Sequence, residues 1–90
     1  MYEVKWRRQA LQNMDHIADF IALDNRERAV SFVHDIFSRV EELRIFPYRG
    51  KAGKRADIRE LVVHQHYLVL YRVGKESIEV LQVWHAAQER

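Results

Sequence analysis

The spacing of hydrophobic residues changes twice along the chain and divides it into three regions. At the start, Tyr2, Val4 and Trp6 alternate with charged residues, which is the two-residue period of a half-buried β-strand. From about Arg7 to Leu23, hydrophobic residues instead recur every three or four positions, which predicts an amphipathic helix. The apolar face of this helix would carry Ala10, Leu11, Met14, Ile17, Ala18 and Ile21.

A second helix is predicted after a short turn. Asp24 and Asn25 are residue types favoured at helix N-caps, and Glu27 follows Asp24 by three positions, as in a capping box. The helical pattern must end before Pro47, whose ring and missing N–H group disfavour a continued helix. Its apolar face would carry Ala29, Val30, Val33, Ile36, Phe37, Val40 and Leu43. Because the connection is so short, the two helices must form an antiparallel hairpin.

The two-residue period returns in the C-terminal half, after a loop over residues 47–54. The segments 64–66 and 74–76 are short enough to be hairpin turns between strands. The predicted strands are Ile58–Val63, Tyr67–Val73 and Ser77–Trp84. The order β–α–α–β–β–β predicts one α+β domain over residues 1–90, with the helical hairpin packed on one face of a mainly antiparallel sheet.

The composition excludes several classes of protein. With 48% hydrophobic and 31% charged residues, the chain is neither disordered nor membrane-embedded, and its longest apolar run is far shorter than a bilayer span. It contains no cysteine, which excludes disulfides, thiolate catalysis and zinc–thiolate sites. Because no signal peptide is recognisable, we expect a cytoplasmic protein without membrane attachment.

Positive charge is concentrated between residues 44 and 59. This segment has a net charge of +5, whereas the whole chain has a net charge of +2. It contains Arg44, Arg49, Lys51, Lys54, Arg55 and Arg59 against Asp57 alone. A basic stretch in a small domain indicates an acidic partner or a nucleic acid, although an ordinary solvated loop has the same composition. The candidate partner-binding or nucleic-acid-binding residues are Tyr48, Arg49, Lys51, Lys54 and Arg55.

A series of short motifs runs through nearly the whole chain. It consists of Trp6, Ala10, Ile17, Ile21, Ala29 and Phe32, then Phe46-Pro47 with Gly50, and then Ile58–Val63, Tyr67–Val73 and Ile78–His85. In this order and spacing, the motifs resemble the RelE/ParE superfamily, the toxins of type II toxin–antitoxin systems. The resemblance implies the RelE/ParE-like fold and a cognate antitoxin that silences the toxin in a hetero-oligomer.

Two activities occur in that superfamily, and the fold alone does not separate them. RelE-type members cleave messenger RNA in the ribosomal A site, whereas ParE-type members inhibit DNA gyrase and cut nothing themselves. A typical RelE-type member has an arginine where this chain has Leu68, and another in the region of Ala86. The C-terminal catalytic tyrosine is also missing, because the chain ends Gln88-Glu89-Arg90. The leading hypothesis is therefore a ParE-like gyrase inhibitor.

A ribosome-dependent mRNA endoribonuclease is the alternative hypothesis, and a basic binding module without toxicity is a third hypothesis. In a nuclease, Arg59, Arg72 and His85 would be the catalytic residues, as phosphate-binding or acid–base groups. Each also has a structural interpretation. Arg59 would form a salt bridge at the sheet edge, Arg72 would be a cation on a sheet face, and His85 would pack near Trp84.

Other chemistry has little support in the sequence. His64 and His66 form an H-x-H pair that suits a metal, but no carboxylate cluster completes such a site. The hydroxyl groups of Ser31 and Ser77 have no base at an evident spacing, and Gly50 with Gly53 does not form a phosphate-binding loop. We therefore expect neither a metal nor another cofactor.

Overall fold

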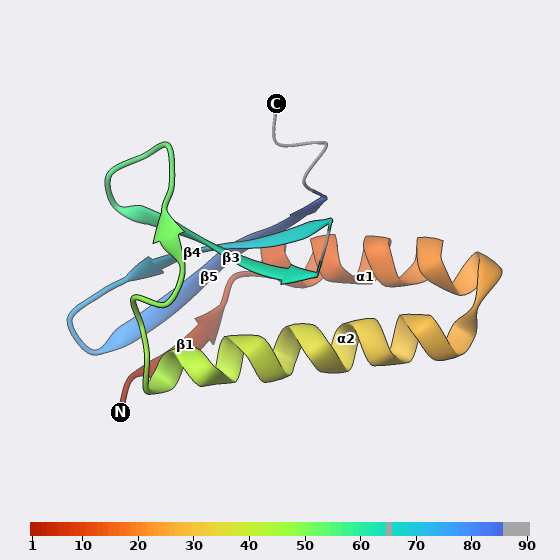
Figure 1. Cartoon of the computed structure of the whole chain (residues 1–90), viewed down its shortest axis with the longest axis horizontal. Helices are drawn as coiled ribbons and strands as arrows, with labels where there is room; N and C mark the ends of the chain where they lie inside the picture. The colour runs from red at the N-terminus through yellow and green to blue at the C-terminus, as the bar shows by residue number, and fades with distance from the viewer. Residues whose placement is uncertain (65, 86–90) are drawn as a thin grey trace.

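The computed structural model of the protein describes residues 1–64 and 66–85 (Figure 1). A short first strand precedes two long helices, and the remaining strands follow them. The elements are β1 (Glu3–Trp6), α1 (Arg8–Asp24), α2 (Arg26–Glu41), a 3₁₀ turn (Glu42–Arg44), β2 (Lys51–Ala52), β3 (Ile58–His64), β4 (Tyr67–Val73) and β5 (Ser77–His85). The sequence-based bounds of both helices and the longer strands therefore agree with the structure to within a few residues. No helix in this part of the chain is long and apolar enough to cross a membrane.

The strands form one five-stranded sheet in the order β1-β5-β4-β3-β2. Only β1 and β5 run parallel, and every other neighbouring pair is antiparallel. The α+β architecture with a mainly antiparallel sheet is thus confirmed. Strand β2 was not predicted, and its residues were expected to belong to the loop over 47–54. This strand has two residues, Lys51 and Ala52, paired with Glu60 and Arg59 of β3, and two residues are too few to show a period.

Helices α1 and α2 form the predicted antiparallel hairpin, with one correction at the turn. Asn25 is the N-cap of α2, because its side chain accepts a hydrogen bond from the Arg28 backbone N–H at 3.1 Å. Asp24 belongs to the last turn of α1, so the predicted Asp24–Glu27 capping box is wrong. At its other end α2 stops at Glu41, and Leu43 lies in the 3₁₀ turn that follows.

The core lies between the helical hairpin and one face of the sheet. Its fully buried side chains include Ile36 and Val40 of α2, Val69 and Tyr71 of β4, and Ile78 and Val80 of β5. Alternation along each strand sends the other residues to the opposite face, which we call the outer face. A β-bulge modifies this alternation, because Leu70 pairs with Gln82 while Tyr71 pairs with Val80. The extra residue of the bulge is Leu81.

The turn of the helical hairpin projects past the ends of the strands (Figure 1). Large apolar side chains are exposed there: Phe20 is 72% exposed, Leu23 82% and Val30 71%. The sheet does not cover this end of the hairpin, so these apolar side chains remain exposed to solvent. We call Phe20, Leu23 and Val30 the hairpin-tip patch.

Candidate functional site

Arg59, a residue of β3, holds the loop that precedes β2. Strand pairing places it between Ala52 of β2 and Tyr71 of β4, on the helix-covered face of the sheet. Its side chain donates hydrogen bonds to the carbonyl oxygens of Gly50 (2.9 Å from Nε) and Tyr48 (3.3 Å from Nη2). Within the described residues, these bonds replace the salt bridge predicted for Arg59.

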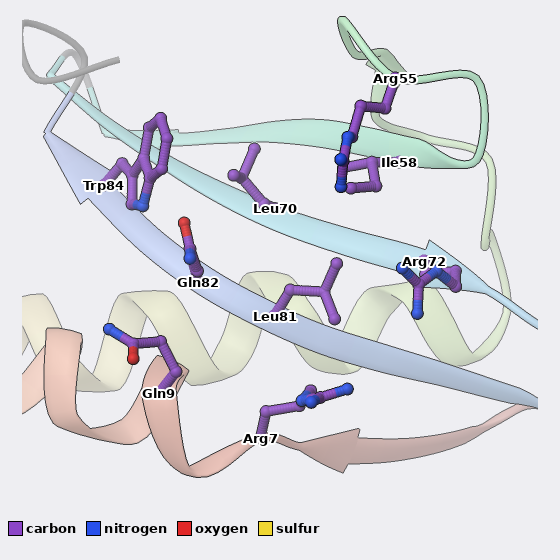
Figure 2. A pocket seen from close by; sticks show the side chains of 9 residues that line it. All are labelled: Arg7, Gln9, Arg55, Ile58, Leu70, Arg72, Leu81, Gln82 and Trp84. Atoms are coloured by element: carbon purple, nitrogen blue, oxygen red, sulfur yellow. The ribbon is translucent and has the colours of Figure 1, made fainter.

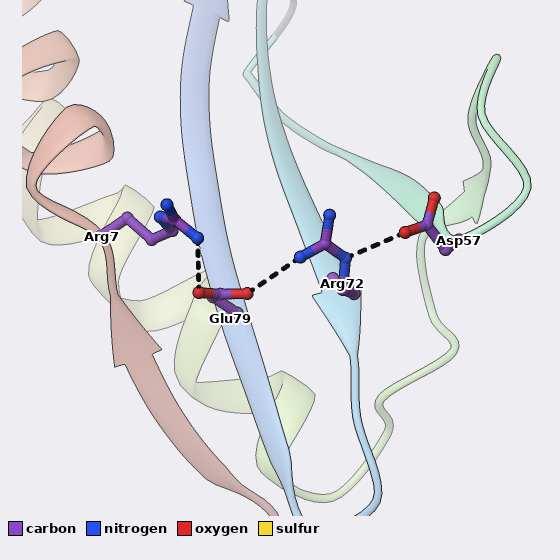
Figure 3. A network of polar contacts seen from close by, with 4 residues as sticks. All are labelled: Arg7, Asp57, Arg72 and Glu79. Carbon is purple, nitrogen blue, oxygen red and sulfur yellow. Dashed lines mark hydrogen bonds and ion pairs between the residues drawn. The ribbon is translucent and has the colours of Figure 1, made fainter.

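Arg72 lies on the outer face, in a chain of ion pairs (Figure 3). Its Nη1 is 3.2 Å from Glu79, its Nε is 3.0 Å from Asp57, and Glu79 also pairs with Arg7 at 2.8 Å. Two cations thus alternate with two carboxylates, from Arg7 just before α1, across β5 and β4, to Asp57 just before β3. Arg72 therefore occupies the predicted position of a cation on a sheet face, with its charge balanced.

His85 lies at the far end of the sheet from Arg59. It pairs with Tyr67, and both residues face the helices. Its ring stacks on His66 with centroids 5.7 Å apart and meets the ring of Tyr67 edge-on at 5.1 Å. A depression of about 430 Å³ beside it is lined by His16, Ile17, Phe20, Tyr67 and His85. His85 is packed among aromatic rings, but these are His66 and Tyr67 and not the predicted Trp84, which lines the outer face of the sheet.

The structure does not bring the three candidate catalytic residues together. Arg72 is on the outer face, whereas Arg59 and His85 are on the face toward the helices. Arg59 and His85 lie opposite Tyr71 and Tyr67, four positions apart on β4, which is about 13 Å along the strand. General acid–base catalysis requires groups within about 3 Å of the same reacting atoms, directly or through one water. These three side chains do not converge on one such point.

The outer face carries a groove that the sequence analysis did not identify (Figure 2). The groove has a volume of about 500 Å³, an apolar floor and basic residues at its rim. It is lined by Arg7, Gln9, Arg55, Ile58, Leu70, Arg72, Leu81, Gln82 and Trp84. Chemically, the groove suits an extended or planar group with negative charge. The bulge that adds Leu81 to this face could not be predicted from alternation, because a bulge breaks that alternation.

The predicted basic segment divides between two surfaces. Arg55 lines the outer groove, and Lys54 lines a depression that shares a wall with it. Tyr48 and Arg49 belong instead to an exposed loop near the end of α2, and Lys51 is exposed on the edge strand. The five residues therefore do not form one binding site.

Other predictions about the site have mixed outcomes. Leu68, at the position of the RelE-type arginine, is 7% exposed and pairs with Trp84. Ala86 and the last three residues lie outside the part of the chain that the structure describes, as does the side chain of His64. Among the described residues, no group of three or more His, Cys, Asp or Glu side chains is placed to hold a metal ion.

Comparisons with known proteins all find similarity to toxins or to a toxin–antitoxin system. Residues 4–90 match the family model of the ParE toxin of the type II toxin-antitoxin system, parDE. A protein of Sinorhizobium fredii named as a toxin, Y4kP, is 32% identical over 87 residues, which cover 96% of this chain and 90% of the relative. Toxin RelE2 of Caulobacter vibrioides is 28% identical over 98% of this chain and 99% of its own length. A solved chromosomal ParDE system from P. aeruginosa superposes with a TM-score of 0.83 at 26% identity, covering 94% of this chain and 96% of that one.

Proposed function

The chain belongs to the ParE toxin family of type II toxin–antitoxin systems, and we propose that it arrests growth by binding DNA gyrase and is neutralised by a cognate antitoxin. The observation that supports binding rather than cleavage is the separation of Arg59, Arg72 and His85. A protein that inhibits by binding needs complementary surfaces, whereas a nuclease needs ionisable groups that converge.

The hydrogen bonds and ion pairs of Arg59 and Arg72 also favour inhibition by binding over RNA cleavage. Arg59 uses its donors on backbone carbonyls of Tyr48 and Gly50, and Arg72 uses its donors on the carboxylates of Asp57 and Glu79. A guanidinium that binds RNA phosphate would have to exchange these partners. The cost of that exchange argues against a nuclease built on these residues.

A ribosome-dependent endoribonuclease is the second candidate function. The relative named Toxin RelE2 favours it, and so does the outer groove, which is lined by Arg7, Arg55 and Arg72 as well as by Trp84 (Figure 2). Cations beside an aromatic ring suit single-stranded RNA, in which bases stack and phosphates pair with arginine.

The hairpin-tip patch suits an antitoxin segment. Large apolar side chains exposed at one end of a small protein suit an interaction surface, and an amphipathic helix or an extended segment with apolar side chains would cover Phe20, Leu23 and Val30. The similarity to the solved chromosomal ParDE TA system from P. aeruginosa supports a complex of this kind. The proposed assembly is a hetero-oligomer of toxin and antitoxin.

Two parallel assays test the choice of target. Purified toxin is added to gyrase with relaxed plasmid, and separately to ribosomes translating a defined mRNA. We expect supercoiling to be blocked and the mRNA to remain intact. Cleaved mRNA with normal supercoiling would establish the endoribonuclease instead, and a protein that neither blocks gyrase, cuts mRNA nor arrests growth is not a toxin.

Substitutions of Arg72 and His85 should separate the two functions further. If the toxin inhibits gyrase, Arg72→Ala and His85→Ala should each remain inhibitory to within a few-fold in the supercoiling assay. If it is a nuclease that uses them, each substitution should reduce mRNA cleavage by about 100-fold or more. Arg72→Ala removes two partly exposed ion pairs that cost at most about 1 kcal/mol each, so the variant should stay folded, as circular dichroism would verify. Arg59→Ala is less informative, because it also releases the loop that Arg59 holds.

A further inference from the structure

Three large apolar side chains are exposed within a single short loop, Ile45–Arg49, between the 3₁₀ turn and β2. Ile45 is 63% exposed, Phe46 53% and Tyr48 61%. Isolated apolar residues on a surface are normal, but a contiguous exposed group usually marks a binding surface. We call residues 45–49 the aromatic loop.

The backbone of the aromatic loop is held in one conformation. Residues 46–49 form a β-turn, in which the Arg49 backbone N–H donates to the Phe46 carbonyl at 3.1 Å, and proline is favoured at the second position, where Pro47 stands. The fully buried Tyr71 fastens this turn to the sheet. Its hydroxyl donates to the Pro47 carbonyl at 2.8 Å and accepts from the Gly50 N–H at 2.9 Å.

Two arginines orient the aromatic rings. The guanidinium of Arg49 lies 4.9 Å from the centre of the Phe46 ring, and that of Arg59 lies 5.3 Å from the centre of the Tyr48 ring. Arg49 is itself paired with Glu42 at 2.8 Å, and Arg59 is anchored on the Tyr48 and Gly50 carbonyls. Because the rings are already ordered, binding through them would cost little conformational entropy.

The residue types match the energetic centre of a protein–protein interface. Aromatic residues and arginine are enriched there, whereas unpaired charges are depleted and lie at the rim. In this loop Phe46 and Tyr48 form the centre together with the aliphatic Ile45, and the ion pairs of Glu42 and Arg49 lie beside them.

The charges around the loop favour a protein over a nucleic acid as its partner. Binding of single strands depends on cations that are free to contact phosphates. Beside the aromatic loop, however, Arg44 pairs with Glu41 at 2.7 Å, and Arg39 and Arg49 both pair with Glu42. The hydrogen bond with Glu41 also raises the pKa of Arg44, because it stabilises the charged guanidinium.

On the side of β2, the charge next to the loop is positive. Lys51, two residues past the loop on the edge strand, is exposed and forms no ion pair in the described part of the protein. A partner surface that extends from the loop to Lys51 would be complementary if it carried carboxylates there.

We propose that the aromatic loop is the surface with which the toxin binds the protein that it inhibits, through an apolar pocket bordered by carboxylates on that protein. This inference rests on the proposed function, in which the inhibited protein is gyrase. The loop lies at the opposite end of α2 from the hairpin-tip patch, about 24 Å away for its 16 residues (Figure 1). Target and antitoxin would therefore contact separate surfaces.

The test replaces the exposed rings and leaves the anchors of the loop in place. Phe46→Ser, Tyr48→Ser and the double variant are compared with the unaltered toxin for half-inhibition of gyrase supercoiling and for growth arrest on induction. We expect each single variant to require at least about tenfold more protein for half-inhibition, and the double variant to fail to arrest growth. Thermal unfolding should change by only a few degrees, because both rings are more than half exposed.

Two control variants make the comparison specific. Val62→Ser removes an apolar side chain that is 49% exposed on β3, away from the loop, and should leave inhibition unchanged within about twofold. Tyr48→Phe keeps the ring under Arg59 and should retain most of the inhibition that Tyr48→Ser loses. If Phe46→Ser and Val62→Ser lose inhibition equally, the effect is not specific to the loop and the inference is wrong.

The remaining outcomes separate the inference from the choice of target. If the folded double variant inhibits as well as the unaltered toxin, the aromatic loop is not the target surface. If the unaltered toxin arrests growth but does not inhibit gyrase, gyrase is the wrong target. Growth arrest by the double variant then tests whether the aromatic loop is the target surface. In that case, loss of arrest in the double variant supports the loop, and retained arrest overturns it. If the double variant loses affinity for a single-stranded RNA oligonucleotide in parallel with its toxicity, the partner is a nucleic acid and the proposed protein pocket is wrong.

Discussion

Alanine at Gly50 should destabilise the protein by about 3 kcal/mol, because the site has no room for a methyl group. A Cβ atom there would lie 2.8 Å from the Glu60 carbonyl oxygen, 2.8 Å from the Tyr71 hydroxyl and 2.9 Å from Tyr71 Cε1. Neither neighbour can move cheaply, since Glu60 is in the paired region of β3 and Tyr71 is fully buried. Urea unfolding followed by circular dichroism measures the loss.

Gly74→Ala is the matched control for this substitution. Gly74 is exposed, between β4 and β5, and the nearest atom to an added Cβ is the Ser77 carbonyl oxygen at 3.2 Å. Both substitutions reduce the freedom of the unfolded chain alike, so their difference reports contacts in the folded state. If Gly50→Ala is as stable as Gly74→Ala, the loop is not docked against β3 and Tyr71 as described.

Gly50 also connects stability with the proposed target surface. Its N–H and carbonyl are partners of Tyr71 and Arg59, the two residues that hold the aromatic loop. A methyl group at this position should displace the loop together with its anchors. Gly50→Ala should therefore inhibit its target less well even at temperatures where it remains folded.

Truncation of Ile36 to alanine should cost about 2–5 kcal/mol, the usual range for a large aliphatic side chain in a core. Ile36 is fully buried on the face of α2 that packs against the sheet, and it belongs to the same cluster as Val69, Tyr71 and Val80. Its removal leaves a cavity, because the sheet and α1 can collapse only partly into the space. Urea unfolding at constant m-value measures the change.

Val30→Ala on the same helix is the control for Ile36→Ala. Val30 is 71% exposed, so its truncation should change stability by no more than about 0.5 kcal/mol. Equal losses for the two variants would mean that α2 does not pack on the sheet through the face that contains Ile36.

The helices were predictable because their signal is local. An apolar face that repeats every three or four residues over about four turns defines a helix wherever it lies, and both helices were predicted close to their observed bounds. The capping box was predicted wrongly, because Asp24 and Asn25 are equally good caps by residue type. The choice between them depends on where α1 ends: Asp24 is its last residue, so Asn25 caps α2 and accepts the hydrogen bond from Arg28.

The candidate site was less predictable, because it depends on register. Alternation shows which residues of one strand share a face, but only pairing between strands places Arg59 opposite Tyr71 and His85 opposite Tyr67. The outer groove also depends on the bulge at Leu81. From the sequence alone, Arg59, Arg72 and His85 could be proposed as catalytic residues, but their separation in the fold could not be predicted.

By itself, the sequence determined the family, the order of the elements and the position of most of the core, because hydrophobic period and motif order are properties of the chain alone. It also showed that basic residues are concentrated between Arg44 and Arg59, with Tyr48 among them. Only the tertiary structure decided that Phe46 and Tyr48 face the solvent while Tyr71 is buried beneath their loop. The physical reason is that the Tyr71 hydroxyl and the Arg59 guanidinium, distant in sequence, satisfy the polar backbone of the loop and thereby fix its side chains outward.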